Sequence, residues 1–574
     1  MLNVQRTRNQ RLTSREELKN SQIGGTPGQH EAIHRLVVRG RVVWFVAAGG
    51  SRIRSPRGGA GRQAAGNGRH GIHVFKGIPY ALPPTGPMRW KPTAPAEIWK
   101  NTRGATEFGF VCVQPKPQPA SIYSWDPKPM SEDCLSLNIW APAGARKAPV
   151  FFWIHGGALS SGSGSDALYD GAALAARGLV VVSINYRLGA LGFLAHPQLS
   201  AESSRHVSGN YGLLDQIAAL RWVNRNIAAF GGDPANVTIA GESAGGLSVM
   251  YLMAAREARG LFAKAIAQSA YMVSAPELRT TPFGGVAAES AGLSLAQKAG
   301  AADLAGLRSM DAEALTAVAA KTGFFPFFVI DGRVLTHQIV DVFDRGEQAK
   351  VPVLAGFNSG EIRSLRSLLP PAVADGAAYE KEIRARYADL AAAFLELYPS
   401  SHVEESMLAT TRDALYGWTS QRLVIKQTAA GVPSFLYLFD HGYPAADARG
   451  LHAFHASELP YVFGTADRTP ARWPAVPTTP VETQLTNAMG DYWASFARTG
   501  TPAAANAPSW PAYGRERNYL AFEAAPQPKV HLMPGMYELN EQVVCRRRAK
   551  GGISWHWNVG LASPPLPAPM PQCQ

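Results

Sequence analysis

The chain has 574 residues, of which 46% are hydrophobic and 17% charged, an ordinary globular composition that excludes a fibrous or wholly disordered protein. Thirteen basic and three acidic residues lie in the first 70 positions, so this leader carries +10 of the net charge of +13 and the rest of the chain only +3. Trp44 and Phe45 are the only aromatic residues in the leader, which is not the pattern of a nucleic-acid-binding module. We therefore expect no nucleic-acid partner.

Residues 1–65 are rich in Arg, Gly and Gln and show no sustained hydrophobic period, which predicts a basic, flexible N-terminal extension. The apolar run at 42–48 has the texture of a signal-peptide core but lies far from Met1, and we interpret it as buried or spurious. No apolar run reaches the ~18 residues that a membrane helix needs. The sequence thus predicts a soluble protein and leaves a cytoplasmic and an exported location open, along with the oligomeric state.

From Gly71 onward, short apolar runs alternate with helical patterns. A strand and an ordered loop are expected from position 71, followed by a helix between the second and third buried strands that ends at Gly231 and Gly232 before Pro234. The strands expected to be covered on both faces span residues 150–154, 179–184, 237–240, 263–267, 351–356 and 435–439. This alternation predicts an α/β fold with a large, mostly parallel sheet and helices on both faces, in which functional groups gather beyond the carboxyl ends of the strands.

The C-terminal tail, residues 561–574, is Pro-rich and is expected to be extended and mobile. Cys573 in this tail is interpreted as an idle thiol. The four cysteines are too few for a disulfide scaffold and match no zinc-site spacing. We expect neither a metal nor a cofactor.

The motif GESAGG, residues 241–246, lies between an apolar strand and a run with the composition of a buried helix. A bare G-x-S-x-G occurs by chance about 0.3 times in such a chain, so the strand-turn-helix setting is what favours a nucleophilic Ser243. Glycines at 241 and 245 allow the close approach that such a turn requires, and the helix directs its positive end at a developing anion. The alternative is a small-residue turn that only packs a helix against a sheet.

A serine nucleophile needs a histidine to accept its proton, a carboxylate to orient that histidine, and backbone N–H donors for the oxyanion. Ala244, directly after the nucleophile, supplies one predicted donor. The loop WIHGGAL, which follows the strand at 150–154, supplies the others from its glycine-rich turn. Two such motifs in the required order are harder to obtain by chance than one.

The sequence closely resembles the type-B carboxylesterase and cholinesterase family, in particular its bacterial para-nitrobenzyl-esterase-like members. The resemblance covers about residues 71–560 and places an α/β-hydrolase domain at 66–560. The matching segments are FKGIPYALPP at 75, SEDCLSLNIW at 131, WIHGGAL at 153, NYRLGALGFL at 185, NYGLLDQIAALRWVNRNIAAFGGDP at 210, GESAGG at 241 and HASELPYVFG at 455.

The resemblance implies a Ser, Glu, His triad, carried by Ser243, by Glu361 in NSGEI and by His455 in HASELPYVFG. Glu361 is otherwise a surface carboxylate in a loop. The rival histidines are His441 and His452; the rival carboxylates are Asp331, which fits a D-G turn, and Asp440.

By the same register the oxyanion donors are Gly157, Ala158 and Ala244, and the change from glycine at 158 is expected to be neutral because only the backbone N–H acts. Ser269 resembles a serine that supports the triad from behind, although Ala270 replaces the family's usual glycine. Cys112 and Cys134 match the family's first disulfide loop, with two reduced buried thiols as the alternative.

Two further matches concern the substrate. Trp125 lies near the position of the cholinesterase residue that binds quaternary ammonium, one residue out of register, so a choline preference is in doubt. FFPFFVIDG, from position 324, resembles the family's acyl-pocket approach, and aromatic core packing accounts for it equally well.

The leader departs from the family, because residues 1–65 offer no good copy of the strand pair that normally precedes the segment at 75. The function implied is hydrolysis of small-molecule carboxylic esters through an acyl-enzyme on Ser243. The alternatives are the hydrolysis of amides, carbamates or thioesters by the same triad and, since neuroligins share this fold, a non-catalytic adhesion protein. The intact motif around Ser243 disfavours the latter.

Overall fold

The computed structural model describes residues 71–99, 101–118, 120–126, 128–556 and 559–573, together with the backbone of four strands nearer the N-terminus. The chain divides into two units, Met1–Val43 and Trp44–Gln574. In the first unit, strands β1 (Val37–Val38) and β2 (Arg41–Val42) pair antiparallel. Apart from these strand backbones, the predicted flexible extension and the apolar run at 42–48 lie outside the described residues.

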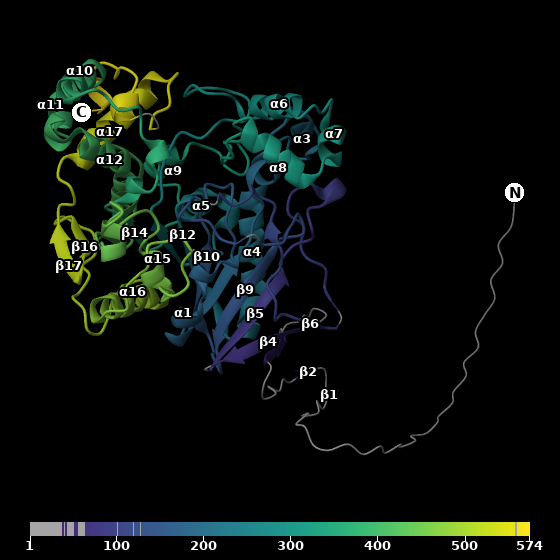
Figure 1. The fold of residues 1–574 in the computed structure, drawn as a ribbon. Coiled ribbons are helices and arrows are strands. Elements are labelled where there is room, and N and C mark those ends of the chain that lie inside the picture. Colours follow the sequence, from purple (N-terminus) through teal and green to yellow (C-terminus); the bar gives the residue numbers. More distant parts are fainter. Residues whose placement is uncertain are drawn as a thin grey trace, which may run out of the picture. The chain divides into compact units, whose positions relative to one another are not determined.

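The second unit is built on a sheet that has 13 strands within the described residues (Figure 1). Its centre is parallel, in the order β11, β10, β12, β13, β14, β15 and β16. Antiparallel pairs extend it at both edges, and β6 pairs parallel with β4. The strands are β3 (Ser51–Arg54), β4 (Gln63–Arg69), β5 (Ile72–Pro79), β6 (Thr102–Gly104), β9 (Ser136–Pro142), β10 (Ala148–Ile154), β11 (Val180–Ile184), β12 (Gly232–Glu242), β13 (Lys264–Gln268), β14 (Val353–Asn358), β15 (Ser434–Phe439), β16 (Asn518–Phe522) and β17 (Pro526–Val530). A separate short pair joins β7 (Val111–Cys112) to β8 (Met130–Ser131).

The central strands are buried on both faces, as their continuous apolar runs predict. In β10, Val150 and Phe152 belong to the core on one face, whereas Phe151 and Trp153 belong to the core on the other. All six predicted strands coincide with β10 to β15 to within a few residues at their ends. The predicted mostly parallel sheet is therefore confirmed.

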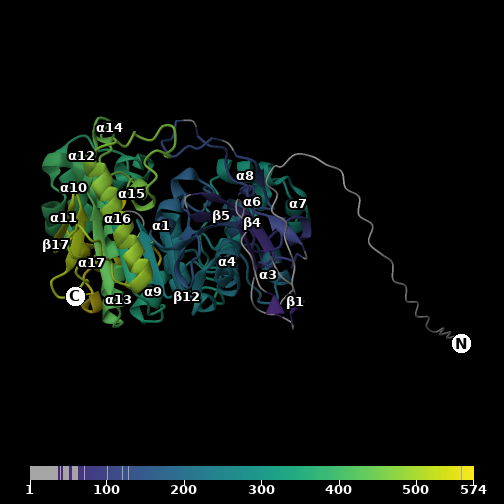
Figure 2. The ribbon, with the colours of Figure 1, turned by 90° about the horizontal axis from the view of Figure 1, so that it is seen from below.

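Helices cover both faces of this sheet. On one face lie α4, α5, α9 and α13; on the other lie α1, α15 and α16, which pack side by side in Figure 2. The helices are α1 (Ala172–Ala176), α2 (Gly189–Phe193), α3 (Pro197–Glu202), α4 (Tyr211–Asn226), α5 (Ala244–Ala254), α6 (Ala288–Lys298), α7 (Leu304–Ser309), α8 (Ala312–Lys321), α9 (Ile339–Asp344), α10 (Gly376–Tyr387), α11 (Ala391–Leu397), α12 (Val403–Arg412), α13 (Trp418–Ala429), α14 (Pro444–Asp447), α15 (Leu459–Phe463), α16 (Pro480–Thr499) and α17 (Met536–Lys550).

Two groups of helices extend beyond the sheet, each around an apolar cluster of its own. Leu295, Leu307 and Leu315 anchor α6, α7 and α8, whereas Ile383 and Phe394 anchor α10 and α11 next to α12 and α17. Figures 1 and 2 both show the two groups on opposite sides of this unit. No helix in the described part of the chain is long and apolar enough to cross a membrane.

Two expectations from the sequence need correction. The strand pair thought missing from the leader exists as β3 and β4, which pair antiparallel, with β4 on β5. At a sheet edge the backbone supplies this pairing, so the hydrophobic alternation that sequence patterns rely on is not required. After α4 a short 3-10 turn follows, and Gly231 ends it with φ of 81° while Gly232 already begins β12.

The C-terminal tail packs against the folded unit. Leu561 and Leu566 are buried in the cluster of α10 and α11, and the Leu566 N–H donates to the Arg386 carbonyl oxygen at 2.7 Å. Cys573 is bonded to Cys545 of α17, so the prediction of an idle thiol is wrong. The sequence pattern missed this because apolar side chains of a Pro-rich segment pack without regular secondary structure.

Candidate active site

Ser243 lies in a tight turn between β12 and α5. Its backbone has φ of 56° and ψ of −123°, a strained conformation for a residue other than glycine. A Cβ atom at Gly245 would lie 2.0 Å from the Ile154 carbonyl oxygen, and one at Gly241 would lie 2.4 Å from the Gly245 carbonyl carbon. Both positions therefore require glycine, and the turn presents Ser243 at the wall of a large cavity.

The loop after β10 lies directly against this turn. A Cβ atom at Gly156 would lie 3.1 Å from Ser243 Cβ and 2.9 Å from Glu242 Oε2, so this loop touches both residues. Gly157 has φ of 98°, and a Cβ there would lie 2.2 Å from the Ser161 carbonyl oxygen. Ala158 also has a left-handed backbone, with φ of 54°, which glycine adopts with less strain. The alanine is thus more strained than a glycine would be, whereas the expectation that the change is neutral for catalysis concerns only its N–H.

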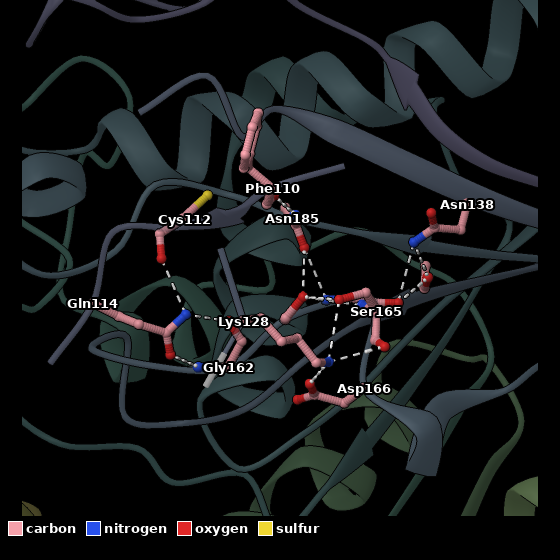
Figure 3. A network of polar contacts seen from close by, with 12 residues as sticks. Phe110, Cys112, Gln114, Lys128, Asn138, Gly162, Ser165, Asp166 and Asn185 are labelled. Atoms are coloured by element: carbon pink, nitrogen blue, oxygen red, sulfur yellow. Dashed lines mark hydrogen bonds and ion pairs between the residues drawn. The ribbon is translucent and has the colours of Figure 1, made fainter. Parts of the chain in front are cut away.

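A dense polar network fixes the continuation of this loop (Figure 3). The Gln114 side chain exchanges hydrogen bonds with the backbone of Gly162, and its amide also donates to the Cys112 carbonyl oxygen at 3.0 Å. Asn185 accepts from the Gly164 N–H at 2.9 Å and donates to the Phe110 carbonyl oxygen at 3.0 Å. These bonds connect the loop to the sheet and to the segment around Cys112, so its backbone donors are held before any ligand arrives.

His455 and Glu361 approach each other from two neighbouring strands. Glu361 begins a short 3-10 turn after β14, and His455 lies in the connection from β15 to α15. The Gly360 N–H donates to the Ala453 carbonyl oxygen at 2.9 Å, which joins the two connections. His455 Nδ1 hydrogen-bonds Glu361 Oε2. The sequence could not show this proximity, because 94 residues separate the two side chains.

Glu361 is fully buried, and its carboxylate has further partners. Oε1 accepts a hydrogen bond from the Ser269 hydroxyl at 2.6 Å and another from the Asn358 N–H at 2.9 Å. Ser269 thus touches the carboxylate that the resemblance assigns it to support, and Ala270 in place of glycine does not prevent this. These bonds fix the orientation of the carboxylate toward the imidazole.

The second nitrogen of His455 faces the glutamate that precedes Ser243. Nε2 lies 3.1 Å from Glu242 Oε1, and the hydrogen bonds among the described residues include none between His455 and the Ser243 hydroxyl. Burial lowers the pKa of His455, but Glu242 and Glu361 outweigh it and raise the pKa to about 9. Burial raises the pKa of Glu242 to about 8, opposed by His455. The imidazole therefore holds a proton readily between two carboxylates.

Sequence reasoning assigned no role to Glu242 or Glu458. Glu458 accepts hydrogen bonds from Gln268 Nε2 at 2.9 Å and from Asn358 Nδ2 at 2.7 Å. Burial, and then the nearby Glu361, raise its pKa to about 7. Both glutamates lie inside motifs already quoted, GESAGG and HASELP, so an acidic residue within three positions of each predicted catalytic residue was the available signal.

The rival residues lie in other contacts. His452 pairs with Asp440 and Asp447 at 3.1 Å each. His441 pairs with Glu482 at 3.0 Å. Asp331 Oδ1 accepts three successive backbone N–H groups, from residues 333 to 335, which is the turn that its D-G sequence predicts. None of these contacts includes Ser243 or Glu361.

A tyrosine on the loop between Cys112 and Cys134 supports the histidine. These two cysteines form a disulfide. The Tyr123 hydroxyl donates to the His455 carbonyl oxygen at 2.9 Å and lies 2.7 Å from Ser364 Oγ. Ser364 follows Glu361 by three residues, so one phenol joins the backbone regions that carry the imidazole and the carboxylate. Nothing in the local sequence pattern marks Tyr123 for this position.

The cavity in front of Ser243 has a volume of about 1580 Å³, larger than the ~300–1,000 Å³ that is usual for a small-molecule site. Gly157, Ala158 and His455 line it together with Ser243. So do Trp125, Phe324, Phe325 and Phe327, whereas Phe328 is fully buried against Tyr251. The aromatic run therefore serves both predicted purposes, cavity lining and core packing. The described residues contain no cluster of His, Cys, Asp and Glu suited to a metal ion.

Comparisons with known proteins agree with this geometry. The model of the Carboxylesterase family matches residues 58–540. The chain is 37% identical to the fumonisin B1 esterase of Sphingopyxis macrogoltabida over 473 residues, 79% of this chain and 83% of that protein. It is likewise 37% identical to the para-nitrobenzyl esterase of Bacillus subtilis (strain 168) over 472 residues, 79% of this chain and 91% of that protein.

Solved structures give the same result. A PNB esterase superimposes with a TM-score of 0.72 and 33% identity, covering 83% of this chain and 97% of that one. A carboxylesterase of Geobacillus stearothermophilus at pH 6.2 superimposes with a TM-score of 0.67 and 34% identity, covering 85% and 99%. The fold is thus the α/β-hydrolase fold. The chain belongs to the carboxylesterase family and is a serine carboxylesterase, a hydrolase of carboxylic esters.

Proposed function

We propose that Ser243, His455 and Glu361 are the catalytic triad of this esterase and that Gly157, Ala158 and Ala244 supply its oxyanion hole. The observation that carries the proposal is the position of His455, bonded through Nδ1 to a buried carboxylate while Nε2 faces the strained turn of Ser243. A base held in one orientation, in the same cavity that the serine lines, is what nucleophilic catalysis by serine requires.

In the proposed reaction, the Ser243 hydroxyl attacks the ester carbonyl carbon while His455 Nε2 accepts its proton. The Glu361 carboxylate stabilises the imidazolium that forms, and the N–H donors hold the oxyanion. The imidazolium then protonates the leaving alcohol, which leaves an ester between Ser243 and the acyl group. A water deprotonated by the same imidazole releases the acid and restores the serine.

Glu242 Oε1 lies 3.1 Å from His455 Nε2, but the two atoms form no hydrogen bond, so Nε2 is not committed to this carboxylate. Catalytic hydrogen bonds are often long or misaligned before substrate binds and tighten in the complex. Substrate binding in this proposal moves the imidazole from the Glu242 carboxylate toward the Ser243 hydroxyl.

The test uses hydrolysis of p-nitrophenyl acetate. Ser243→Ala is expected to lower kcat by about 10⁴-fold or more, because it removes the proposed nucleophile. An organophosphonate is expected to add one equivalent to Ser243, located by peptide mass spectrometry. The matched control is Ser124→Ala, since Ser124 lines the same cavity. Full activity of Ser243→Ala, or labelling at another serine, would overturn the assignment.

We also propose that the protein resides in an oxidising compartment. All four cysteines of the sequence are paired, as Cys112–Cys134 and Cys545–Cys573. Disulfides of this kind persist outside reducing compartments. Protein purified from its native source and alkylated after unfolding, without reductant, is expected to carry no modified cysteine; four modified cysteines would contradict the proposal.

A further inference from the structure

A second cavity adjoins the one in front of Ser243. Its volume is about 760 Å³, and four residues line both cavities: Ser274, Pro276, Val286 and Ser554. The hydroxyl oxygens of Ser274 and Ser554 lie 2.7 Å apart at this boundary. We name the second cavity, bordered by residues 274–277, 280–286, 386, 552–554 and 561–564, the distal chamber. The catalytic cavity thus continues into additional space that the proposed triad does not use.

One wall of the distal chamber comes from the C-terminal segment, beyond the residues that the family model matches. The Gly552 N–H donates to the Pro282 carbonyl oxygen at 2.7 Å, which joins this wall to the opposite one. Trp555 and His556, directly behind Ser554, are buried, and the His556 ring stacks on Trp418 with ring centroids 4.7 Å apart. The disulfide Cys545–Cys573 closes the segment covalently. The wall is therefore fixed in place.

The chemistry of the chamber indicates what it accepts. Of its two charged groups, Arg386 pairs with the countercharge of Glu382 at 2.8 Å, whereas the Glu277 carboxylate accepts a hydrogen bond from the neutral Thr280 hydroxyl at 2.7 Å. The other lining side chains are hydroxyls and apolar groups, Thr281, Ser563, Phe283, Ile553 and Leu561 among them. An anionic ligand would find no free positive charge among these lining residues, whereas a chain without negative charge that carries both carbon and oxygen atoms would find partners for each.

We propose that the distal chamber is a subsite for the far end of a long ester substrate, namely an arm without negative charge that carries both apolar and hydrogen-bonding groups. This inference rests on the proposed triad at Ser243. It assigns to the C-terminal segment, which the family match leaves out, a part in choosing the substrate.

The experiment compares kcat/KM for short and long esters. The short reference is p-nitrophenyl acetate; the long ones are p-nitrophenyl dodecanoate and the p-nitrophenyl ester of an oligo(ethylene glycol) acid of similar length. Acetate esters of dodecanol and of an oligo(ethylene glycol) monoether place the same arms on the alcohol side. The wild-type enzyme is expected to prefer the oligo(ethylene glycol) arm over the dodecyl arm on one of the two sides.

The variant Ile553→Trp fills the distal chamber without touching the cavity in front of Ser243, since Ile553 lines only the former. It is expected to lower kcat/KM for the preferred long ester about tenfold more than for the acetate, mainly through KM. The control Ser204→Trp places the same side chain at an exposed position that lines neither cavity. It is expected to keep the wild-type ratio of kcat/KM for the long ester to kcat/KM for the acetate.

A second variant, Ser554→Phe, narrows the boundary between the two cavities and is also expected to lower the ratio of kcat/KM for the long ester to that for the acetate. It replaces Ile553→Trp in the test if that variant does not fold. An unchanged ratio in a folded variant, or an equal loss on short and long esters, would overturn the subsite. A preference for the dodecyl arm on both sides would contradict the proposed polar character. Failure of the triad is a separate outcome, because Ser243→Ala would then still hydrolyse the acetate.

Discussion

The proposed triad and the walls of the cavity have different structural support. Ser243 and Glu361 follow the strands β12 and β14, are at most 9% exposed, and are fixed by bonds from neighbouring strands. The walls are drawn largely from loops, including the two that disulfides close around Tyr123 and around Ser554. Loops on a rigid scaffold change without disturbing it. In the two proposals made above, the chemistry therefore belongs to the sheet, whereas access and substrate choice belong to the cross-linked loops.

The strongest test of the sheet side of this comparison is Glu361→Gln. The glutamine oxygen can still accept from Ser269 and the Asn358 N–H, but its amide nitrogen then faces His455 Nδ1 and favours the wrong tautomer. We expect kcat for p-nitrophenyl acetate to fall by about 10³–10⁴-fold. The fold should persist, as checked by circular dichroism and thermal unfolding. A loss below tenfold in a folded variant would mean that another carboxylate orients His455.

Glu242→Gln tests the electrostatics of the same centre. The proposed base works only when His455 is neutral, so activity should rise with pH as the proton leaves the cluster of His455 and Glu242. Removing the Glu242 charge removes a cause that raises the pKa of His455, and the acid limb of kcat/KM should move to lower pH. At a pH on that acid limb, kcat/KM divided by its high-pH plateau should be about tenfold higher in Glu242→Gln than in the wild type.

The control for this profile is Glu404→Gln, which removes an exposed carboxylate paired with Arg366 and should leave the profile unchanged. A shift of the Glu242→Gln profile toward higher pH would show that Glu242 does not favour the protonated imidazole.

Tyr123→Phe probes the point where the first disulfide loop reaches the triad. The change removes the hydrogen bond to the His455 carbonyl oxygen, one neutral bond worth about 1 kcal/mol. We expect kcat to fall about threefold to tenfold with little change in KM, because the bond positions the base and does not hold the substrate. The control is Tyr443→Phe, whose hydroxyl donates to the Pro474 carbonyl oxygen at 2.9 Å away from the cavity lining. Equal losses of kcat in both variants would exclude a specific role for Tyr123.

The same division explains what the sequence could predict. The strands and the turn around Ser243 are visible in local patterns, because burial on both faces and the need for glycine at 241 and 245 act on neighbouring residues. His455 and Glu361 could be assigned only through the family resemblance, since no local pattern brings them together. Tyr123 was not found, because its contact with His455 depends on how a long loop folds over the sheet.

Two further misses have the same physical origin. Cys545 and Cys573 are bonded through packing of a Pro-rich tail that has no periodic pattern. The edge strands β3 and β4 pair through their backbones in a stretch rich in Gly and Arg. In both cases long-range contacts, which single-sequence patterns do not record, decide the structure.

The smallest effect on catalysis is expected from Cys545→Ser with Cys573→Ser. The two disulfides close loops of similar length, with a sequence separation of 28 for Cys545–Cys573 and 22 for Cys112–Cys134. Chain entropy therefore predicts a loss of about 3.5 kcal/mol in the free energy of unfolding for either pair. Urea unfolding measures this loss. Hydrolysis of p-nitrophenyl acetate at 25 °C separates the two loops: only the Cys112→Ser and Cys134→Ser pair should also lower kcat, because only that loop carries a side chain bonded to His455. Equal losses of kcat from both pairs would contradict a specific role of the Cys112–Cys134 loop in positioning His455.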